Sequence, residues 1–122
     1  MKLELRANPR ELVVNGVPIK DQGRILLEAD EMVTFVTCSG AEFDFTQKTW
    51  GFYATPSLNG RLAEFGLRTA LILNRKTGKY YVLIVERGRE SLFEDYLAQQ
   101  DAEVLHWLDS TEALEALRSK IF

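Results

Sequence analysis

Two apolar runs separated by five polar residues constrain the fold of this chain more than any other feature of its sequence. The runs are residues 67–73 and 79–86, and both are rich in Leu, Ile, Val and Tyr. Such residues are enriched in β-strands, and the short polar segment 74–78 between the runs predicts two neighbouring strands. Because apolar residues hardly alternate with polar ones, we expect both strands to be buried on both faces, near the centre of a sheet.

The N-terminal half has the pattern of several short strands. Segments 3–6, 11–14, 17–19, 24–28, 32–37, 41–46 and 50–54 alternate apolar with polar residues or are rich in β-branched and aromatic ones. Asn8-Pro9 is a turn pair, and Asn15-Gly16 between apolar runs predicts a type I′ hairpin turn. Pro18 cannot donate a ladder hydrogen bond, which favours a sheet edge. The half is therefore predicted to be an antiparallel meander.

Three short helices are expected in the rest of the chain. Thr55 as N-cap and Pro56 at the first position predict a helix over 56–65, closed by Gly66 as a left-handed cap. A second helix is expected over 90–99, with Leu92, Phe93, Tyr96 and Leu97 on its apolar side. A strand at 103–108 and a third helix follow, which begins with a capping box whose cap is Asp109.

These elements predict an α+β fold in which the meander is followed by the order β-β-α-β-α and the helices pack on the sheet. We find no repeat or linker, and 122 residues match a common domain size. A single domain over residues 1–122 is therefore expected.

Composition argues against several classes of partner. The formal net charge is −3, which disfavours general nucleic-acid binding, since such binding depends on Lys and Arg. No run approaches the ~20 apolar residues of a membrane helix, and the N-terminus lacks the apolar core of a signal peptide. Cys38 is the only cysteine, so no internal disulfide is expected. Together these features favour a cytoplasmic protein that binds neither nucleic acid nor membranes.

No motif for a metal or a cofactor is present. The chain has no Cys-x-x-Cys pair, no paired histidines, no phosphate-binding loop of the Walker type and no dinucleotide fingerprint. We therefore expect neither a metal nor a cofactor.

The segment 50–62 is the strongest candidate for a ligand site. A helix beginning at 56 would present free N–H groups to an anion, beside the hydroxyls of Thr55 and Ser57. Arg61 would pair with a carboxylate or phosphate. The predicted ligand-binding residues are Trp50 and Tyr53 as a stacking surface, Ser57 for anion contact through its N–H group together with that of Leu58, Thr55 and Asn59 for orientation, and Arg61 for charge.

The same residues also fit a purely structural role. The aromatic side chains fit a strand packed in the core, and Thr55-Pro56 fits an ordinary helix cap. Gly60 fits a close approach of the helix to the sheet, and Arg61 fits an ion pair with Glu64. Both interpretations stay open at this point.

Two alternatives to a binding module also stay open. The first is a small enzyme that uses His106, the only histidine, with Cys38 or with an acid such as Asp109 or Asp44. The second is a structural subunit or homodimer that takes no small ligand.

The stretch WGFYATPSLNGRL at 50–62, followed by Gly66-Leu-Arg-Thr-Ala-Leu, resembles a segment of small bacterial proteins for which no activity is established. Those proteins are associated with loci for surface-glycan or nonulosonic-acid biosynthesis. The resemblance implies a bacterial cytoplasmic setting and a sugar or sugar nucleotide as ligand. Our leading hypothesis is a binding or accessory module for an anionic or sugar-like ligand, or for a partner protein, around the start of the 56–65 helix.

Overall fold

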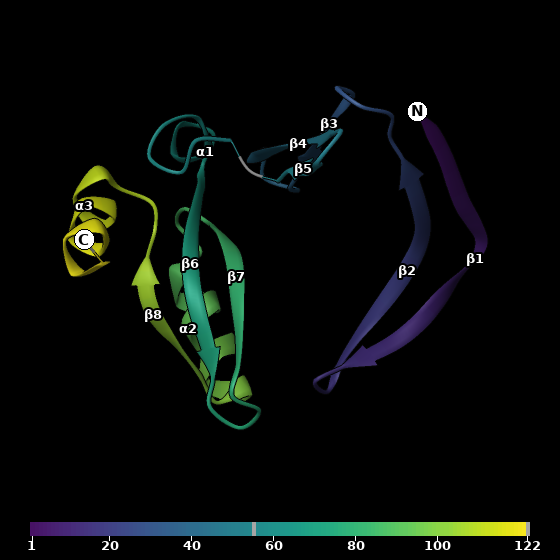
Figure 1. Ribbon diagram of the computed structural model, residues 1–122. Helices are drawn as coiled ribbons and strands as arrows, with labels where there is room; N and C mark the ends of the chain where they lie inside the picture. The colour runs from purple at the N-terminus through teal and green to yellow at the C-terminus, as the bar shows by residue number, and fades with distance from the viewer. Residues whose placement is uncertain (55, 122) are drawn as a thin grey trace. The chain divides into compact units, whose positions relative to one another are not determined.

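The computed structural model describes residues 1–54 and 56–121, and their contacts divide the chain into two compact units. The first, which we call the hairpin unit, consists of Met1–Val33 and Phe45–Ala54. The second, the helical unit, consists of Thr34–Asp44 and the chain from residue 56 onward. Figure 1 shows the helices and strands of both units. The expectation of a single domain stays a prediction.

The hairpin unit begins with two long antiparallel strands, β1 (Lys2–Val14) and β2 (Val17–Leu26). Their turn confirms the prediction made from Asn15-Gly16, because both residues have positive φ, 50° and 80°. Val14 lies opposite Val17, so the loop between the strands has two residues.

The expected turn at Asn8-Pro9 is wrong, because β1 continues through this pair. The register instead shifts between Leu5 and Arg10, so the pair lies in an irregular bulge of the strand. Proline is tolerated there because a bulged residue has no ladder hydrogen bond to lose. Gly23 lies opposite Leu5 with φ 134°, and a Cβ at this position would be 2.1 Å from the carbonyl oxygen of Glu4.

A second sheet has the order β3-β4-β5, formed by β3 (Met32–Val36), β4 (Glu42–Lys48) and β5 (Gly51–Tyr53). The strands β4 and β5 are antiparallel, with Lys48 opposite Gly51, and the Phe45 and Phe52 rings lie 4.8 Å apart. The antiparallel meander predicted for the N-terminal half is thus confirmed.

The helical unit contains a third sheet with the order β7-β6-β8, and both outer strands are antiparallel to β6. Its strands are β6 (Leu67–Asn74), β7 (Lys79–Glu86) and β8 (Ala102–Trp107). The helix α2 (Glu90–Gln100) connects β7 to β8 and covers one face of this sheet (Figure 1). Leu97 and Phe93 of α2 pack there against Ala70 and Ile72 of β6 to form a core. The order β-β-α-β-α and the α+β class are confirmed.

Only one of the two long apolar strands is central, so the expectation for the other is wrong. The strand β6 has a neighbour on each side, whereas β7 is an edge strand. Tyr80, Val82 and Ile84 of β7 are exposed, because α2 packs on the opposite face, where Leu83 joins the core. A continuous apolar run therefore does not mark a buried strand here.

The helix expected over 56–65 is also wrong in its extent, because α1 (Arg61–Glu64) is a single turn. The preceding residues form turns in which the Ser57 carbonyl oxygen accepts from the N–H groups of Gly60 and Leu62, at 3.3 and 3.1 Å. Asn59-Gly60 favours such turns over helix. The predicted left-handed cap is present at Gly66, with φ 91°, and Leu62 is buried with Ala41 and Leu67.

The third helix, α3 (Thr111–Ile121), differs from expectation at its cap. The Ser110 Oγ, rather than Asp109, accepts the N–H of Ala113 at 3.1 Å. Asp109 is unavailable because it accepts a hydrogen bond from Arg68 Nε at 2.6 Å. In α2, Phe93 and Leu97 face the core as expected, but Leu92 and Tyr96 are exposed.

Candidate functional site

The six predicted ligand-binding residues fall into both units. Trp50 and Tyr53 belong to the hairpin unit, at the turn between β4 and β5 and at the end of β5. Both rings are largely exposed, Trp50 by 70% and Tyr53 by 52%. Ser57, Asn59 and Arg61 belong to the helical unit. Thr55 lies outside the described residues.

In the helical unit, each of the three predicted residues already has a partner within the protein. The Ser57 Oγ accepts the N–H of Arg61 at 2.8 Å, and Asn59 Nδ2 donates to Thr111 Oγ1 at 3.1 Å. Gly60 leaves room for this turn, since a Cβ there would be 2.6 Å from the Ser57 Oγ. The amides at the start of α1 therefore bind Ser57, and a single helical turn has only a small dipole to attract an anion.

Arg61 forms the best-defined ion pair of the segment. Its Nε donates to Asp44 Oδ2 at 2.7 Å, and its guanidinium lies 4.3 Å from the centre of the Phe65 ring. Asp44 also accepts from Thr34 Oγ1 at 2.8 Å. The hydrogen bond from Arg61, followed by that from Thr34, lowers the pKa of Asp44. Arg61 thus holds Asp44 and Phe65 in place, and it pairs with Asp44 rather than with Glu64.

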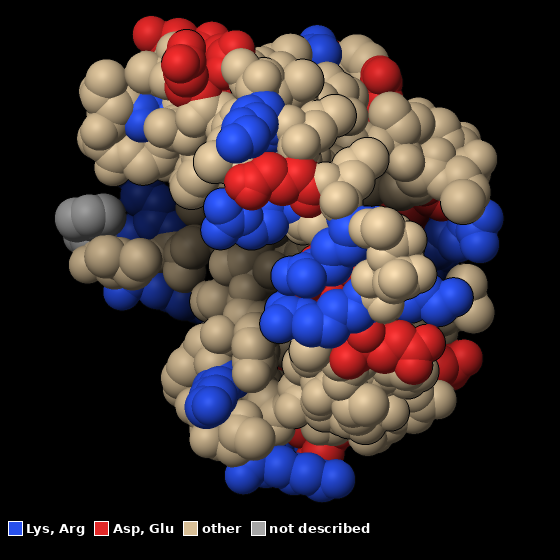
Figure 2. Space-filling model, turned by 90° about the vertical axis from the view of Figure 1, so that its right-hand side faces the viewer, with Lys and Arg blue, Asp and Glu red and all other residues tan. Residues whose placement is uncertain are grey.

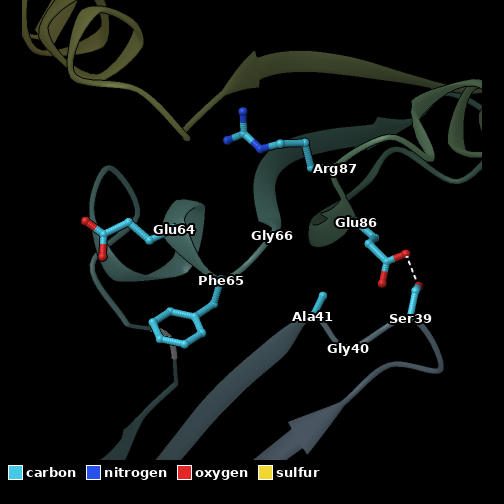
Figure 3. Close-up of a pocket in the computed structure, with 8 residues that line it drawn as sticks. All are labelled: Ser39, Gly40, Ala41, Glu64, Phe65, Gly66, Glu86 and Arg87. Carbon is cyan, nitrogen blue, oxygen red and sulfur yellow. Dashed lines mark hydrogen bonds between the residues drawn. The ribbon is translucent and has the colours of Figure 1, made fainter.

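A pocket of about 380 Å³ lies at the other end of α1, within the helical unit (Figure 3). Three segments line it: Ser39, Gly40 and Ala41; Glu64, Phe65 and Gly66; and Glu86 with Arg87. Backbone hydrogen bonds fix these walls, from Arg87 N to Gly66 O at 2.8 Å and from Glu42 N to Phe65 O at 3.2 Å. Gly40 and Gly66 have φ near 90°, at 93° and 91°, which glycine adopts without strain.

Glu86 fastens the turn that forms one wall of the pocket. Its carboxylate accepts from the hydroxyls of Thr37 and Ser39, the latter at 2.6 Å, and from Arg89 Nε at 3.2 Å. The hydrogen bond from Ser39, then that from Thr37, lowers the pKa of Glu86. With three donors around it, Glu86 has a structural role and remains charged at neutral pH.

Arg87 is the pocket residue that sequence reasoning missed. Its guanidinium makes no hydrogen bond or ion pair with any residue that the structure describes. Figure 3 shows it above Gly66, whereas the carboxylate of Glu64 points away from it. The sequence signal for Arg87 was the segment Glu86-Arg87-Gly88-Arg89, three of whose four residues are charged, at the end of an apolar strand. Charged groups at strand ends are common on protein surfaces, so the segment alone does not single out Arg87.

The residues of the enzyme hypothesis have other partners. His106 Nε2 lies 2.6 Å from the Ala113 carbonyl oxygen and so ties β8 to α3. Asp109 and Asp44, the acids considered as its partners, accept hydrogen bonds from Arg68 and Arg61. Cys38 is an exposed free thiol. No contact among these residues favours catalysis, and the enzyme alternative stays a hypothesis.

Charges of both signs are intermixed on the protein surface. Figure 2 shows groups of Lys and Arg beside groups of Asp and Glu on one face of the molecule. Within residues 1–54 and 56–121, no three potential ligands gather in a way that could hold a metal ion. None of the helices in this part of the chain has the length and hydropathy needed to cross a membrane.

Comparisons of this chain with protein-family models, with curated proteins and with solved structures found no match. A function for this chain is therefore inferred from the geometry of the pocket and from the chemistry of its side chains.

Proposed function

We propose that this protein is a non-enzymatic binding module for a small anionic, sugar-like ligand, held in the pocket beside Arg87. The observation that carries the proposal is that Arg87 lines the pocket and that its guanidinium has no hydrogen-bond or ion-pair partner among the described residues. An arginine fork binds a carboxylate or phosphate through two parallel hydrogen bonds. Glu86 lines the same pocket, but its carboxylate is bound by Thr37, Ser39 and Arg89 and makes no ion pair with Arg87.

The other walls suit a ligand that carries hydroxyl groups. Ser39 and Phe65 both line the pocket, and the Ser39 hydroxyl, which donates to Glu86, can still accept a hydrogen bond from a ligand. A volume of about 380 Å³ is at the small end of the range for ligand pockets, which favours a ligand of monosaccharide size. The resemblance of segment 50–62 to proteins of surface-glycan loci supports the same class of ligand. We therefore favour a sugar acid or sugar phosphate, bound in a bacterial cytoplasm.

The sequence predicted an anion contact at Arg61, whereas we now propose this contact at Arg87. Arg61 keeps an indirect part, because its ion pair with Asp44 holds the ring of Phe65 at the pocket wall. The predicted site and the pocket thus share the segment around α1, but they use opposite ends of it.

The proposal is tested by titrating the ¹⁵N-labelled protein with glucuronate, and with methyl glucoside as the uncharged counterpart. We expect glucuronate to shift the amide signals of Ser39, Gly66 and Arg87. Replacing Arg87 with Ala should weaken this binding at least about tenfold, since a hydrogen bond to a charged group contributes ~1.5–3 kcal/mol. Arg87→Lys should retain part of the affinity, because it keeps the charge but loses the fork.

Arg118→Ala is the matched control, because Arg118 is an exposed arginine of α3 outside the pocket. It should leave the titration unchanged. Equal binding of glucuronate to the wild type and to Arg87→Ala, or equal responses to glucuronate and methyl glucoside, would show that Arg87 is no anion site.

A further inference from the structure

We infer that Glu90 is a positioning residue for the ligand site beside Arg87, and that Arg68 holds Glu90 in place for this role. The inference rests on the proposed function, because it concerns how the proposed anion contact is oriented. It goes beyond that function by assigning a role to two residues that do not line the pocket. All the contacts that carry it lie within the helical unit.

Arg87 is the second residue of a tight turn at the end of β7. The N–H of Arg89 donates to the Glu86 carbonyl oxygen at 3.0 Å, which closes a turn of four residues. Gly88, the third residue, has a φ of 91°, as in a type II turn. In a type I turn, the peptide group between the second and third residues would point the other way. A contact to this peptide group therefore favours one orientation over the other.

Both peptide groups beside the Cα atom of Arg87 are held by hydrogen bonds. On the N-terminal side, the Arg87 N–H donates to the Gly66 carbonyl oxygen at 2.8 Å. On the C-terminal side, the Gly88 N–H donates to Glu90 Oε1 at 2.5 Å. Because peptide groups are planar, their two orientations determine φ and ψ of Arg87 and hence the direction of its Cα–Cβ bond. Glu90, together with Gly66, thus fixes the direction in which the Arg87 side chain leaves the backbone.

Glu90 can hold the turn because its own carboxylate is held from the other side. While Oε1 accepts from Gly88, Oε2 accepts from Arg68 Nη1 at 3.2 Å. The guanidinium of Arg68 has two further contacts: Nε donates to Asp109 Oδ2 at 2.6 Å, and the group lies 3.9 Å from the centre of the Trp107 ring. The Arg68 side chain is only 23% exposed. The turn is thus tied to β6 and β8 through side chains that have little freedom to move.

A fixed backbone at Arg87 increases the affinity for a ligand through preorganisation. The Arg87 guanidinium has no hydrogen-bond or ion-pair partner among the described residues, so the direction set by its backbone is what orients it. A ligand that binds a mobile arginine must order it, and this loss of freedom weakens binding. Less freedom is lost when the backbone already fixes the start of the side chain. Glu90 therefore contributes to affinity without touching the ligand.

The test compares two substitutions of Glu90 in the titration with glucuronate. Glu90→Ala removes the acceptor of the Gly88 N–H, and we expect binding to be about two- to tenfold weaker, the range for ordering one long side chain. Glu90→Gln keeps an oxygen acceptor for this N–H and should retain most of the affinity. A role that depended only on the charge of Glu90 at the start of α2 would instead weaken binding equally in both variants.

A second measurement needs no ligand. In spectra of the ¹⁵N-labelled protein without glucuronate, the Gly88 amide proton should resonate further upfield in Glu90→Ala than in the wild type, because its hydrogen bond is lost. Glu90→Gln should leave this signal closer to its wild-type position. Circular dichroism of both variants should match the wild type, which separates a change in the turn from a loss of the fold.

Glu94→Ala is the matched control, because Glu94 is an exposed acid of α2, one helical turn after Glu90. It should change neither the affinity nor the Gly88 signal. Wild-type affinity in Glu90→Ala overturns this inference and leaves the proposed function intact, as does equal weakening in Glu90→Ala and Glu90→Gln. An unshifted Gly88 signal in Glu90→Ala overturns it as well. A wild type that binds no glucuronate overturns the proposed function and this inference together.

Discussion

Arg61 and Arg87 lie in the same unit but have opposite surroundings. Arg61 donates to Asp44 and covers the ring of Phe65, whereas Arg87 has no partner among the described residues. An arginine that is already paired must give up that pair before it binds a ligand, so its net contribution to affinity is small. The free arginine is therefore the better anion contact, although the sequence around Arg61 looks more like a site.

The role of Arg61 can be tested by replacing it with Ala. We expect the free energy of unfolding to fall by about 1 kcal/mol, because both the ion pair and the ring contact are lost. Urea denaturation of Arg61→Ala measures this loss. Arg118→Ala is the control, and it should lose little stability because the ion pair of Arg118 is long, at 3.8 Å, and exposed. A variant as stable as the wild type would show that the contact with Asp44 is only incidental.

Among the elements, the segment before α1 shows what the spacing of apolar residues predicts about the structure and what it does not. The spacing of Leu58, Leu62 and Phe65 is helical, and Leu58 and Leu62 do pack in one core cluster. The chain nevertheless reaches this packing through a turn followed by one helical turn. Ser57 provides the turn with a side-chain acceptor, which competes with helix formation. The helical spacing thus predicted that Leu58 and Leu62 pack in the core, but it did not predict that a turn, rather than a helix, precedes α1.

The hairpin of β1 and β2 depends on Gly23 for a steric reason. We expect Gly23→Ala to destabilise the hairpin unit by ~1–3 kcal/mol more than Gly51→Ala does. Both glycines have similar φ, 134° and 140°, so the cost of that backbone conformation is similar in the two variants. Only at Gly23 would the new Cβ lie against backbone, 2.1 Å from the Glu4 carbonyl oxygen, whereas nothing lies within 4 Å of it at Gly51.

Hydrogen exchange of the β1 and β2 amides measures the effect of these two substitutions, because it reports on the hairpin separately from the helical unit. Equal protection in the Gly23→Ala and Gly51→Ala variants would mean that the bulge opens to accept a side chain.

For the whole molecule, five carboxylates with a lowered pKa determine the response to acid. Four of them accept a strong hydrogen bond: Asp21 from Gly23 N, Glu31 from Glu28 N, Asp44 from Arg61 and Glu86 from Ser39. For the fifth, Glu90, desolvation raises the pKa, but hydrogen bonds from the backbone N–H groups of Glu90 and Gly88 outweigh this effect. Their charged forms stabilise the fold. This stability is fully present above the usual values of 3.8 for Asp and 4.5 for Glu, and it is lost as the pH falls through the lowered values.

We therefore expect the free energy of unfolding to be nearly constant between about pH 5 and 7 and to fall steadily below that range. Urea denaturation at a series of pH values measures this dependence. Glu86→Gln should make the decrease shallower, because one of the five carboxylates no longer titrates. Stability that rises on acidification to pH 3 would contradict the assignment.

The sequence by itself determined the features that depend on neighbouring residues. Asn15-Gly16 specified a turn with two positive φ angles, Gly66 a left-handed cap, and local periodicity the order β-β-α-β-α. Only the tertiary structure decided that β7 lies at an edge, that Asp44 binds Arg61 and that Arg87 lines a pocket. The physical reason is distance along the chain: backbone preferences act within a few residues, whereas burial and ion pairing depend on residues that only folding brings together.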